Sequence, residues 1–113
     1  MTKILITETI GARCISATSG FQLFNLLNVL LSKNEVIELN FAGVNIFASP
    51  FFNNSIGRLY AAYPKDYLDR LIKFNNLTEY GNMLVAKVIE NSQSFKTNSN
   101  IQAAIDEILK DQE

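Results

Sequence analysis

The residue types that most often carry out catalysis are scarce in this sequence. Its 113 residues include no histidine and one cysteine, Cys14. Histidine-based triads and dyads are therefore impossible, and zinc and iron–sulfur sites lack their usual ligands. The acids are scattered, without a D-x-D pair or a calcium-loop pattern, and no GxGxxG or phosphate-loop motif occurs. A magnesium or calcium site made of carboxylates alone stays formally open, but we expect no enzyme, no cofactor and no metal site.

With these kinds of site not expected, the remaining function is binding of a partner at the protein surface. The candidate residues for this binding begin at Ser49. This serine precedes a proline, a pairing typical of a helix start, because serine caps free N–H groups and proline has none to lose. Helical spacing then places Asn53, Asn54 and Arg58 opposite the apolar face of that helix. Two interpretations stay open for these three residues: a docking face for another protein, or an ordinary solvated stripe.

Phe51 lies in the same predicted helix. Its spacing puts it away from the centre of the apolar face formed by Phe52, Ile56 and Leu59. It is therefore either an exposed apolar anchor for a partner or an addition to the core.

Size and charge narrow the class of protein. A chain of this length fits one domain, and 48% hydrophobic with 19% charged residues is typical of a globular protein. The net charge of −1 offers no basic excess for nucleic acid. The N-terminus lacks the features of a signal peptide, and the apolar stretch Phe21–Leu31 is interrupted by Gln22, Asn25 and Asn28. We expect a cytoplasmic protein that binds neither nucleic acid nor membrane, with Cys14 as a small buried residue.

Strand and helix signals alternate along the chain. Residues 3–10 alternate apolar and polar side chains as a strand does, and 36–41 are rich in β formers. Apolar residues recur at helical spacing after Ser19, the expected cap of the first helix, and from Ser49 to Pro64. The expected elements are a strand at 3–10, a short strand or loop at 12–17, a helix at 19–32, a strand at 36–41, an extended run at 44–48, a helix at 49–63, a strand at 71–74 and a helix at 77–91. This order predicts an α/β domain with parallel strands covered by helices.

The C-terminal part is predicted to be separate from this domain, which we expect to cover residues 1–92. Residues 93–100 are polar and are expected to form a linker. Apolar residues then recur from Ile101 to Ile108 at i, i+3, i+4 and i+7, which predicts a helix over 101–113. That helix docks either on the domain itself or on another subunit, in which case the protein is a homodimer.

The segment VIELNFAGVNIFASPFFNNSIGRLY, residues 36–60, resembles part of a known family. Asn40-Phe41-Ala42-Gly43-Val44 matches a strand end of the type D-F-x-G-V. Ser49 and Phe51 match a serine and a phenylalanine at a helix start, and Gly57-Arg58-Leu59 matches a helix end of the type G-K-L. Further matches flank this segment within residues 11–20 and 72–76. In their order and spacing they resemble the STAS-like family of unknown function. Its relatives are the sulphate-transporter and anti-sigma-factor-antagonist domains. The likeness covers about residues 3–92.

The resemblance implies a STAS-like single domain. Its sheet would be mixed and four- to five-stranded, with helices packed mainly on one face and, here, an extra C-terminal helix. Family members are protein-interaction modules, often encoded beside or fused to histidine-kinase-like ATPases or helix-turn-helix regulators. The resemblance therefore implies a regulatory, non-enzymatic bacterial protein with a protein partner of that kind encoded nearby.

The resemblance also implies two alternatives at the same helix start. In the antagonists a partner kinase phosphorylates a serine there, and the added charge blocks docking. In this chain that serine position falls on Pro50, and the serine before it on Ser49. Other STAS relatives hold a small ligand or nucleotide near this point, which makes Ser49 and Arg13 candidates for an anion or ligand site. For Arg13, a surface salt bridge is the competing interpretation.

Overall fold

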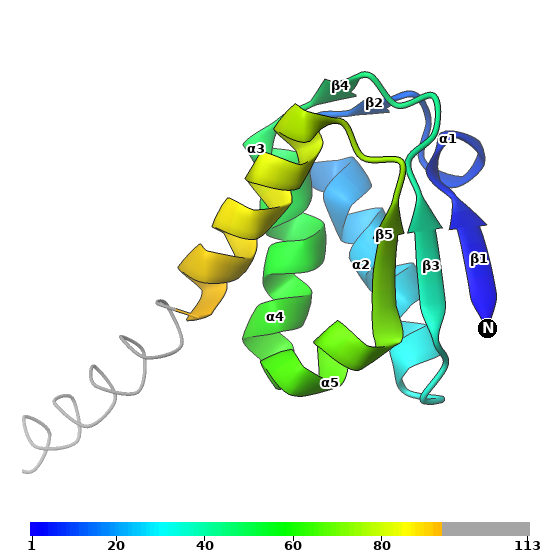
Figure 1. Cartoon of the computed structure of the whole chain (residues 1–113), viewed down its shortest axis with the longest axis vertical. Helices are drawn as coiled ribbons and strands as arrows, with labels where there is room; N and C mark the ends of the chain where they lie inside the picture. The colour runs from blue at the N-terminus through cyan, green and yellow to red at the C-terminus, as the bar shows by residue number, and fades with distance from the viewer. Residues whose placement is uncertain (94–113) are drawn as a thin grey trace, which may run out of the picture.

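Three parallel strands form the larger sheet of the molecule (Figure 1). They are β1 (Thr2–Leu5), β3 (Ile37–Asn40) and β5 (Ile72–Asn75), hydrogen-bonded in the order β1-β3-β5. The structure is a computed structural model and describes residues 1–93. Each connection between neighbouring strands runs through helices, as parallel pairing requires.

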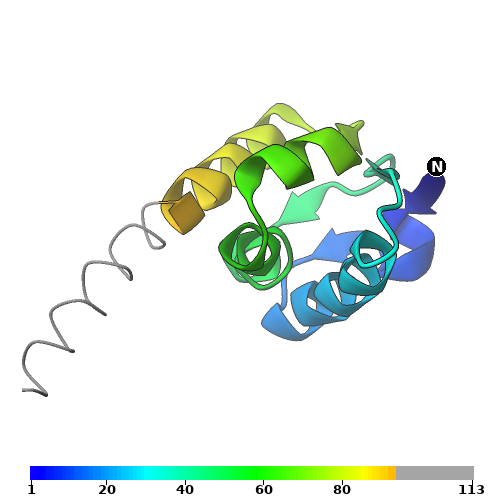
Figure 2. The ribbon, with the colours of Figure 1, turned by 90° about the horizontal axis from the view of Figure 1, so that it is seen from below.

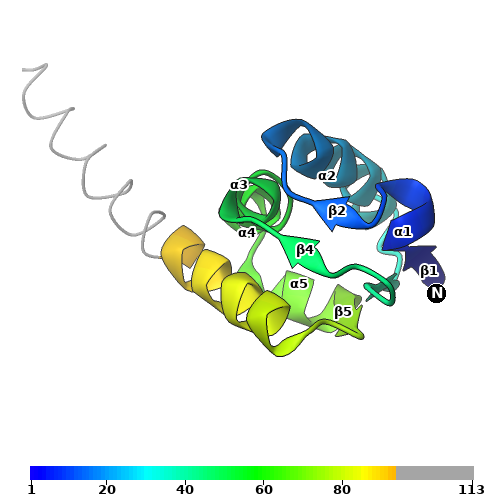
Figure 3. The same cartoon turned by 90° about the horizontal axis from the view of Figure 1, so that it is seen from above.

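The two faces of this sheet differ in character. Ile4 and Leu39 are register partners and both are buried, on the side where the helices lie (Figures 2 and 3). On the opposite face Lys3, Glu38 and Lys73 form a row across the three strands. The apolar face therefore belongs to the core and the charged face to the surface.

A second sheet has two short parallel strands, β2 (Arg13–Cys14) and β4 (Ile46–Phe47). It lies beyond the ends of β1 and β3 (Figures 1 and 3). The expected single mixed sheet is therefore wrong for residues 1–93, where the five strands pair in parallel and belong to two sheets. The α/β class is confirmed.

The division into two sheets begins where the chain leaves β1. The strand predicted over 3–10 ends at Leu5, and a helical turn, α1 (Ile6–Thr9), follows with Ile6 fully buried. Gly11 has φ 126°, a backbone conformation that favours glycine. Because the chain turns here, residues 13–14 pair with β4 and not with the neighbours of β1.

Helices account for most of the remaining described chain. The first long one is α2 (Ala17–Leu31). A continuous helical run from residue 49 to residue 62 consists of α3 (Ser49–Phe52), the π-helical turn η1 (Asn53–Gly57) and α4 (Arg58–Ala62). Pro64 ends this run as predicted, and α5 (Lys65–Leu71), which the sequence did not reveal, follows. The last helix is described over residues 79–93.

The cap of α2 is not the predicted residue. The Ser16 hydroxyl accepts the backbone N–H of Ser19 at 3.0 Å, so Ser16 caps the helix and Ser19 lies within its first turn. Both serines precede the apolar spacing, and a cap needs extended backbone, which Ser16 has at φ −86° and ψ 151°.

A glycine allows α2 to lie very close to the helical run 49–62. A Cβ at Gly20 would meet the Phe51 carbonyl oxygen at 2.3 Å and the Asn54 Cβ at 3.1 Å. Only a residue without a side chain fits there, so the two helices are in backbone contact.

Phenylalanines fill the core beneath this contact. Phe52 lies 5.5 Å from Phe47 and 6.1 Å from Phe41, measured between ring centroids, and all three are buried. Phe51 meets Phe52 edge to face at 5.3 Å. These rings connect the residue after β3 with β4 and α3, which fixes the start of the helical run relative to both sheets.

A buried tyrosine ties α4 to α5. The Tyr60 hydroxyl donates to Asp69 at 2.8 Å, and Lys65 Nζ donates to the same carboxylate at 2.6 Å. Burial raises the pKa of Tyr60, and its bond to the carboxylate adds to the rise. Burial also opposes the charge of Asp69, but the two donors outweigh it and hold the pKa of that carboxyl below its usual range.

Two further predictions concern membranes and the C-terminal region. Within residues 1–93, no helix combines the length and apolar character of a membrane span. Residue 93 is helical, whereas the rest of the predicted linker and the predicted helix at 101–113 lie outside the described residues.

Candidate functional site

The predicted docking residues lie on the helical run 49–62. Ser49, Asn53 and Arg58 are exposed, and Asn54 is half-buried. The π-helical turn in the middle of the run contains buried Ser55, whose hydroxyl donates to the Phe51 carbonyl at 2.9 Å. π-helical turns are frequent at functional sites, and this one changes the direction in which the following side chains project.

Phe51 is not an exposed anchor. Its side chain is fully buried, so it cannot contact a partner in this conformation, and the docking prediction for this residue is wrong. The physical reason is the close approach of α2 at Gly20, which covers the side of the helix on which Phe51 lies. The helical spacing of residues 49–62 identifies the side of the helix that faces the core, but it does not show that α2 covers a second side.

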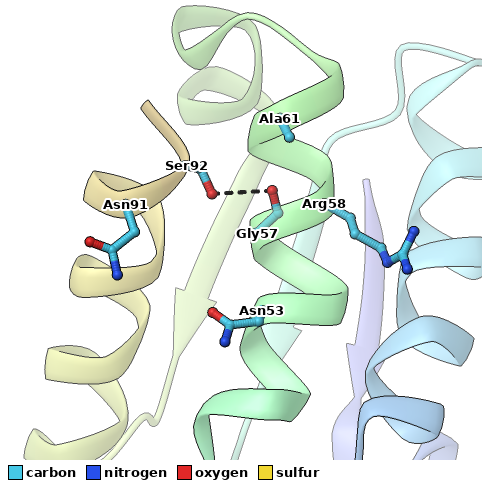
Figure 4. Close-up of a pocket in the computed structure, with 6 residues that line it drawn as sticks. All are labelled: Asn53, Gly57, Arg58, Ala61, Asn91 and Ser92. Carbon is cyan, nitrogen blue, oxygen red and sulfur yellow. Dashed lines mark hydrogen bonds between the residues drawn. The ribbon is translucent and has the colours of Figure 1, made fainter. Parts of the chain in front are cut away.

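The side chains of Asn53 and Arg58 point to opposite sides of the helical run. Figure 4 shows the Asn53 side chain directed toward the last helix and the Arg58 side chain directed the other way, toward α2. Both residues line one groove, but the guanidinium of Arg58 reaches a second surface on the other side of the helical run. That Asn53, Asn54 and Arg58 form one docking face stays a prediction.

The Asn53 side borders a groove of about 350 Å³ between the helical run and the last helix (Figure 4). The Ser92 hydroxyl shares its one hydrogen between the Gly57 carbonyl at 3.2 Å and the Val88 carbonyl at 2.9 Å, and the contact with Gly57 joins the two walls. The residues that line the groove are Asn53, Gly57, Arg58, Ala61, Asn91 and Ser92. Their side chains are small or neutral apart from Arg58, whose guanidinium points away from the groove.

The Arg58 side forms a second surface, which we call the Phe21–Arg58 surface and define by Phe21, Phe24, Asn54 and Arg58. The guanidinium carbon of Arg58 lies 5.0 Å from the Phe21 ring centroid and 6.0 Å from that of Phe24. The two rings are stacked with centroids 6.0 Å apart. Phe21 is 44% exposed, so a large apolar side chain and a cation lie side by side at the surface.

The position of the guanidinium is fixed by a short chain of hydrogen bonds. Arg58 Nε donates to Asn54 Oδ1 at 3.3 Å, and Asn54 Nδ2 donates to the Pro50 carbonyl at 2.9 Å. Sequence reasoning assigned Asn54 and Arg58 to a candidate surface but did not include Phe21 or Phe24. Their i, i+3 spacing on α2 was a usable signal, but their position against Arg58 depends on how the helices pack.

Ser49 and Arg13 do not form a common anion site. Ser49 is the first residue of α3, and Ala48 occupies the cap position without a side-chain hydrogen bond, so Ser49 is not the predicted cap. Arg13 is exposed on β2, with Ile46 as its register partner. In the part of the chain that the structure describes, no hydrogen bond or ion pair joins Arg13 to Ser49, and neither lines the groove. A ligand or phosphate site at these residues stays a prediction.

The thiol of Cys14 is shielded from solvent. Cys14 is fully buried, and burial raises the pKa of its thiol to about 11. At neutral pH the thiol is therefore protonated and shielded. Among residues 1–93, no group of three acid or cysteine side chains lies close enough to hold a metal ion.

Comparison with protein families finds a match to a STAS-like domain of unknown function. The family model covers residues 19–82, which include most of α2, the helical run 49–62, α5 and β5. The Phe21–Arg58 surface lies within the matched region. Comparisons with curated proteins and with solved structures find no match.

Proposed function

The chain belongs to the family of STAS-like domains of unknown function, and from this premise we propose that it is a small regulatory module that binds another protein. Docking uses the helical run that starts at Ser49 together with the adjoining part of α2. The proposal includes a cytoplasmic, non-enzymatic role, with a histidine-kinase-like ATPase or a helix-turn-helix regulator as the class of partner.

The Phe21–Arg58 surface is the observation that supports this proposal. Arginine and aromatic side chains are enriched among the residues that contribute most to protein–protein binding. Here they are already held in position, because Arg58 is fixed by Asn54 and lies on two rings. A surface that is ordered before binding loses little side-chain entropy when the partner docks.

The backbone beneath this surface is also closely packed. Gly20 brings α2 into contact with the carbonyl of Phe51, and the phenylalanine rings fix α3 against the core. The positions of Phe21 and Arg58 are therefore set by two packed helices and not by a loop. The absence of histidine from the sequence and the shielded thiol of Cys14 favour binding over catalysis.

Affinity capture from cells of the native host, with the partner quantified by mass spectrometry, tests this function. We expect a partner that the wild type retains and that Phe21→Ser and Arg58→Gln each reduce by roughly tenfold or more. Arg70→Gln on α5 is the matched control, since it removes an exposed arginine elsewhere. If the wild type and all three variants recovered the same amount of partner, binding would not use this surface.

A further variant separates the two sides of the helical run. Asn53→Lys places a bulky cation at the groove and leaves the Phe21–Arg58 surface unchanged (Figure 4). We expect it to capture the partner as the wild type does. Loss of the partner through Asn53→Lys, with Arg58→Gln unaffected, would move the docking site to the groove.

A further inference from the structure

Arg58 is the one charged residue of α2 and the helical run 49–62. No other charged residue occurs in residues 14–32, which include the whole of α2, or in residues 39–64, which include the helical run. Its guanidinium therefore lies between two helices that carry no other charged side chain. A single cation in such surroundings is less screened by neighbouring charges than one in a mixed surface network.

The guanidinium also has unused hydrogen-bonding capacity. Within residues 1–93, Arg58 makes one hydrogen bond as donor, from Nε, and no ion pair with a carboxylate. The two terminal nitrogens are left to donate outward, while the face of the group lies on Phe21 and Phe24. The planar fork of arginine matches the two oxygens of a carboxylate, with which it forms paired, charge-assisted hydrogen bonds.

We propose that the protein partner presents an aspartate or glutamate carboxylate to Arg58, beside an apolar side chain that covers Phe21. This inference rests on the proposed function and names the chemistry of the partner. The apolar contact removes the exposed part of the Phe21 ring from water and excludes solvent around the ion pair. Asn54 keeps the guanidinium oriented and acts as a positioning residue.

A peptide or protein acid fits this surface better than a nucleic acid does. Binding to a phosphate backbone draws on several cations that neutralise successive phosphates. Residues 14–32 and 39–64 together provide one, and the net charge of the protein is −1. One carboxylate matches one arginine, and the exposed phenylalanine supplies the apolar part of the contact.

The test uses a random peptide library displayed on phage. Binders are selected on the full chain and depleted on Arg58→Gln, so that only peptides depending on Arg58 remain. We expect these peptides to share an acidic residue next to a large apolar one. Measured by fluorescence polarisation, Arg58→Gln and replacement of the peptide acid by its amide should each weaken binding by roughly tenfold or more.

The decisive result is how these two changes combine. If the acid contacts Arg58, the double change weakens binding little more than either single change does, because the first already removes the interaction. Arg58→Lys should recover only part of the affinity, since lysine keeps the charge but lacks the planar fork. Arg70→Gln should bind as the wild type does, and circular dichroism verifies that each variant is folded.

Several outcomes would overturn the inference. A carboxylate partner would be excluded if the losses of affinity from Arg58→Gln and from the amide peptide multiplied fully in the double change. It would also be excluded if the selected peptides had no acid, or if no peptide depended on Arg58. Binding of short single-stranded DNA at physiological salt, lost in Arg58→Gln, would assign the arginine to phosphate. Peptides that depend on Phe21 and Arg58 but need no acid would overturn this inference and leave the proposed function standing. Docking at this surface is excluded if partner capture is insensitive to both residues, and the proposed function fails if the wild type captures no partner.

Discussion

Replacing Gly20 by alanine tests the close contact on which the docking surface depends. The added Cβ would lie 2.3 Å from the Phe51 carbonyl oxygen. Carbon and oxygen atoms in close contact are usually about 3.3 Å apart or more. The two helices must therefore separate locally by about 1 Å, since the obstacle is backbone and cannot rotate away.

The magnitude follows from two opposing effects. Overpacking a tight contact costs about 1–3 kcal/mol, and a backbone obstacle places Gly20→Ala near the upper end. Alanine recovers about 1 kcal/mol relative to glycine through its higher helix propensity. We therefore expect a net loss of about 2 kcal/mol in the free energy of unfolding. For a domain of this size, that loss lowers Tm by roughly 10 °C.

Urea and thermal unfolding, followed by circular dichroism, measure this loss. Asn25→Ala is the matched control, because Asn25 is exposed on the same helix and alanine there gains propensity without a clash. The control should be as stable as the wild type or slightly more stable. If Gly20→Ala matched the control, the backbone contact between α2 and α3 would not limit packing, and the account of how Phe21 is placed against Arg58 would be refuted.

Three further predictions concern the caps, the acid response and the thiol. Ser16→Ala should lower the free energy of unfolding by about 1 kcal/mol, as measured in urea, because it removes a helix cap. Ser49→Ala should change the same quantity by less than about 0.5 kcal/mol, and an equal loss would contradict the assignment of the caps. Because the pKa of Asp69 is lowered in the folded state, its contribution is complete above its unfolded pKa of about 4 and is lost as the pH falls through its folded pKa. Urea titrations at several acidic pH values should show a shallower decline for Asp69→Asn than for the wild type, and identical declines would argue against the role of the Tyr60 and Lys65 donors. The thiol of Cys14 should react with a thiol reagent on the order of 100-fold more slowly in the folded protein than in urea, and comparable rates would show that it is accessible.

The class of fold could be predicted because it depends on local pattern. The β formers of 36–41 and the residues around Ile72 occur where the structure has strands, and the apolar spacing after residue 19 identifies α2. Pro64 ends a helix through its own ring geometry. Each of these signals acts within a few residues, so neighbouring sequence is sufficient to reveal it.

The pairing of strands could not be predicted in the same way. The alternation over 3–10 is equally compatible with a strand that ends at Leu5 and continues as a helical turn whose first residue, Ile6, is buried. Residues 13–14 are too short to specify a partner, and β4 provides one only because the rest of the chain brings it there. The expected mixed sheet failed for this reason.

The candidate site shows the same division between local and long-range information. Local sequence is enough to show that Arg58 is the only charge in residues 39–64, that the chain has no histidine, and that a helix follows Ser49. Contacts between distant segments determine that Phe51 is buried, that Asn53 borders a groove, and that Phe21 lies under the guanidinium. The physical reason is that helical spacing fixes directions within one helix, whereas exposure and contact depend on which second helix comes close, and Gly20 sets that distance for α2.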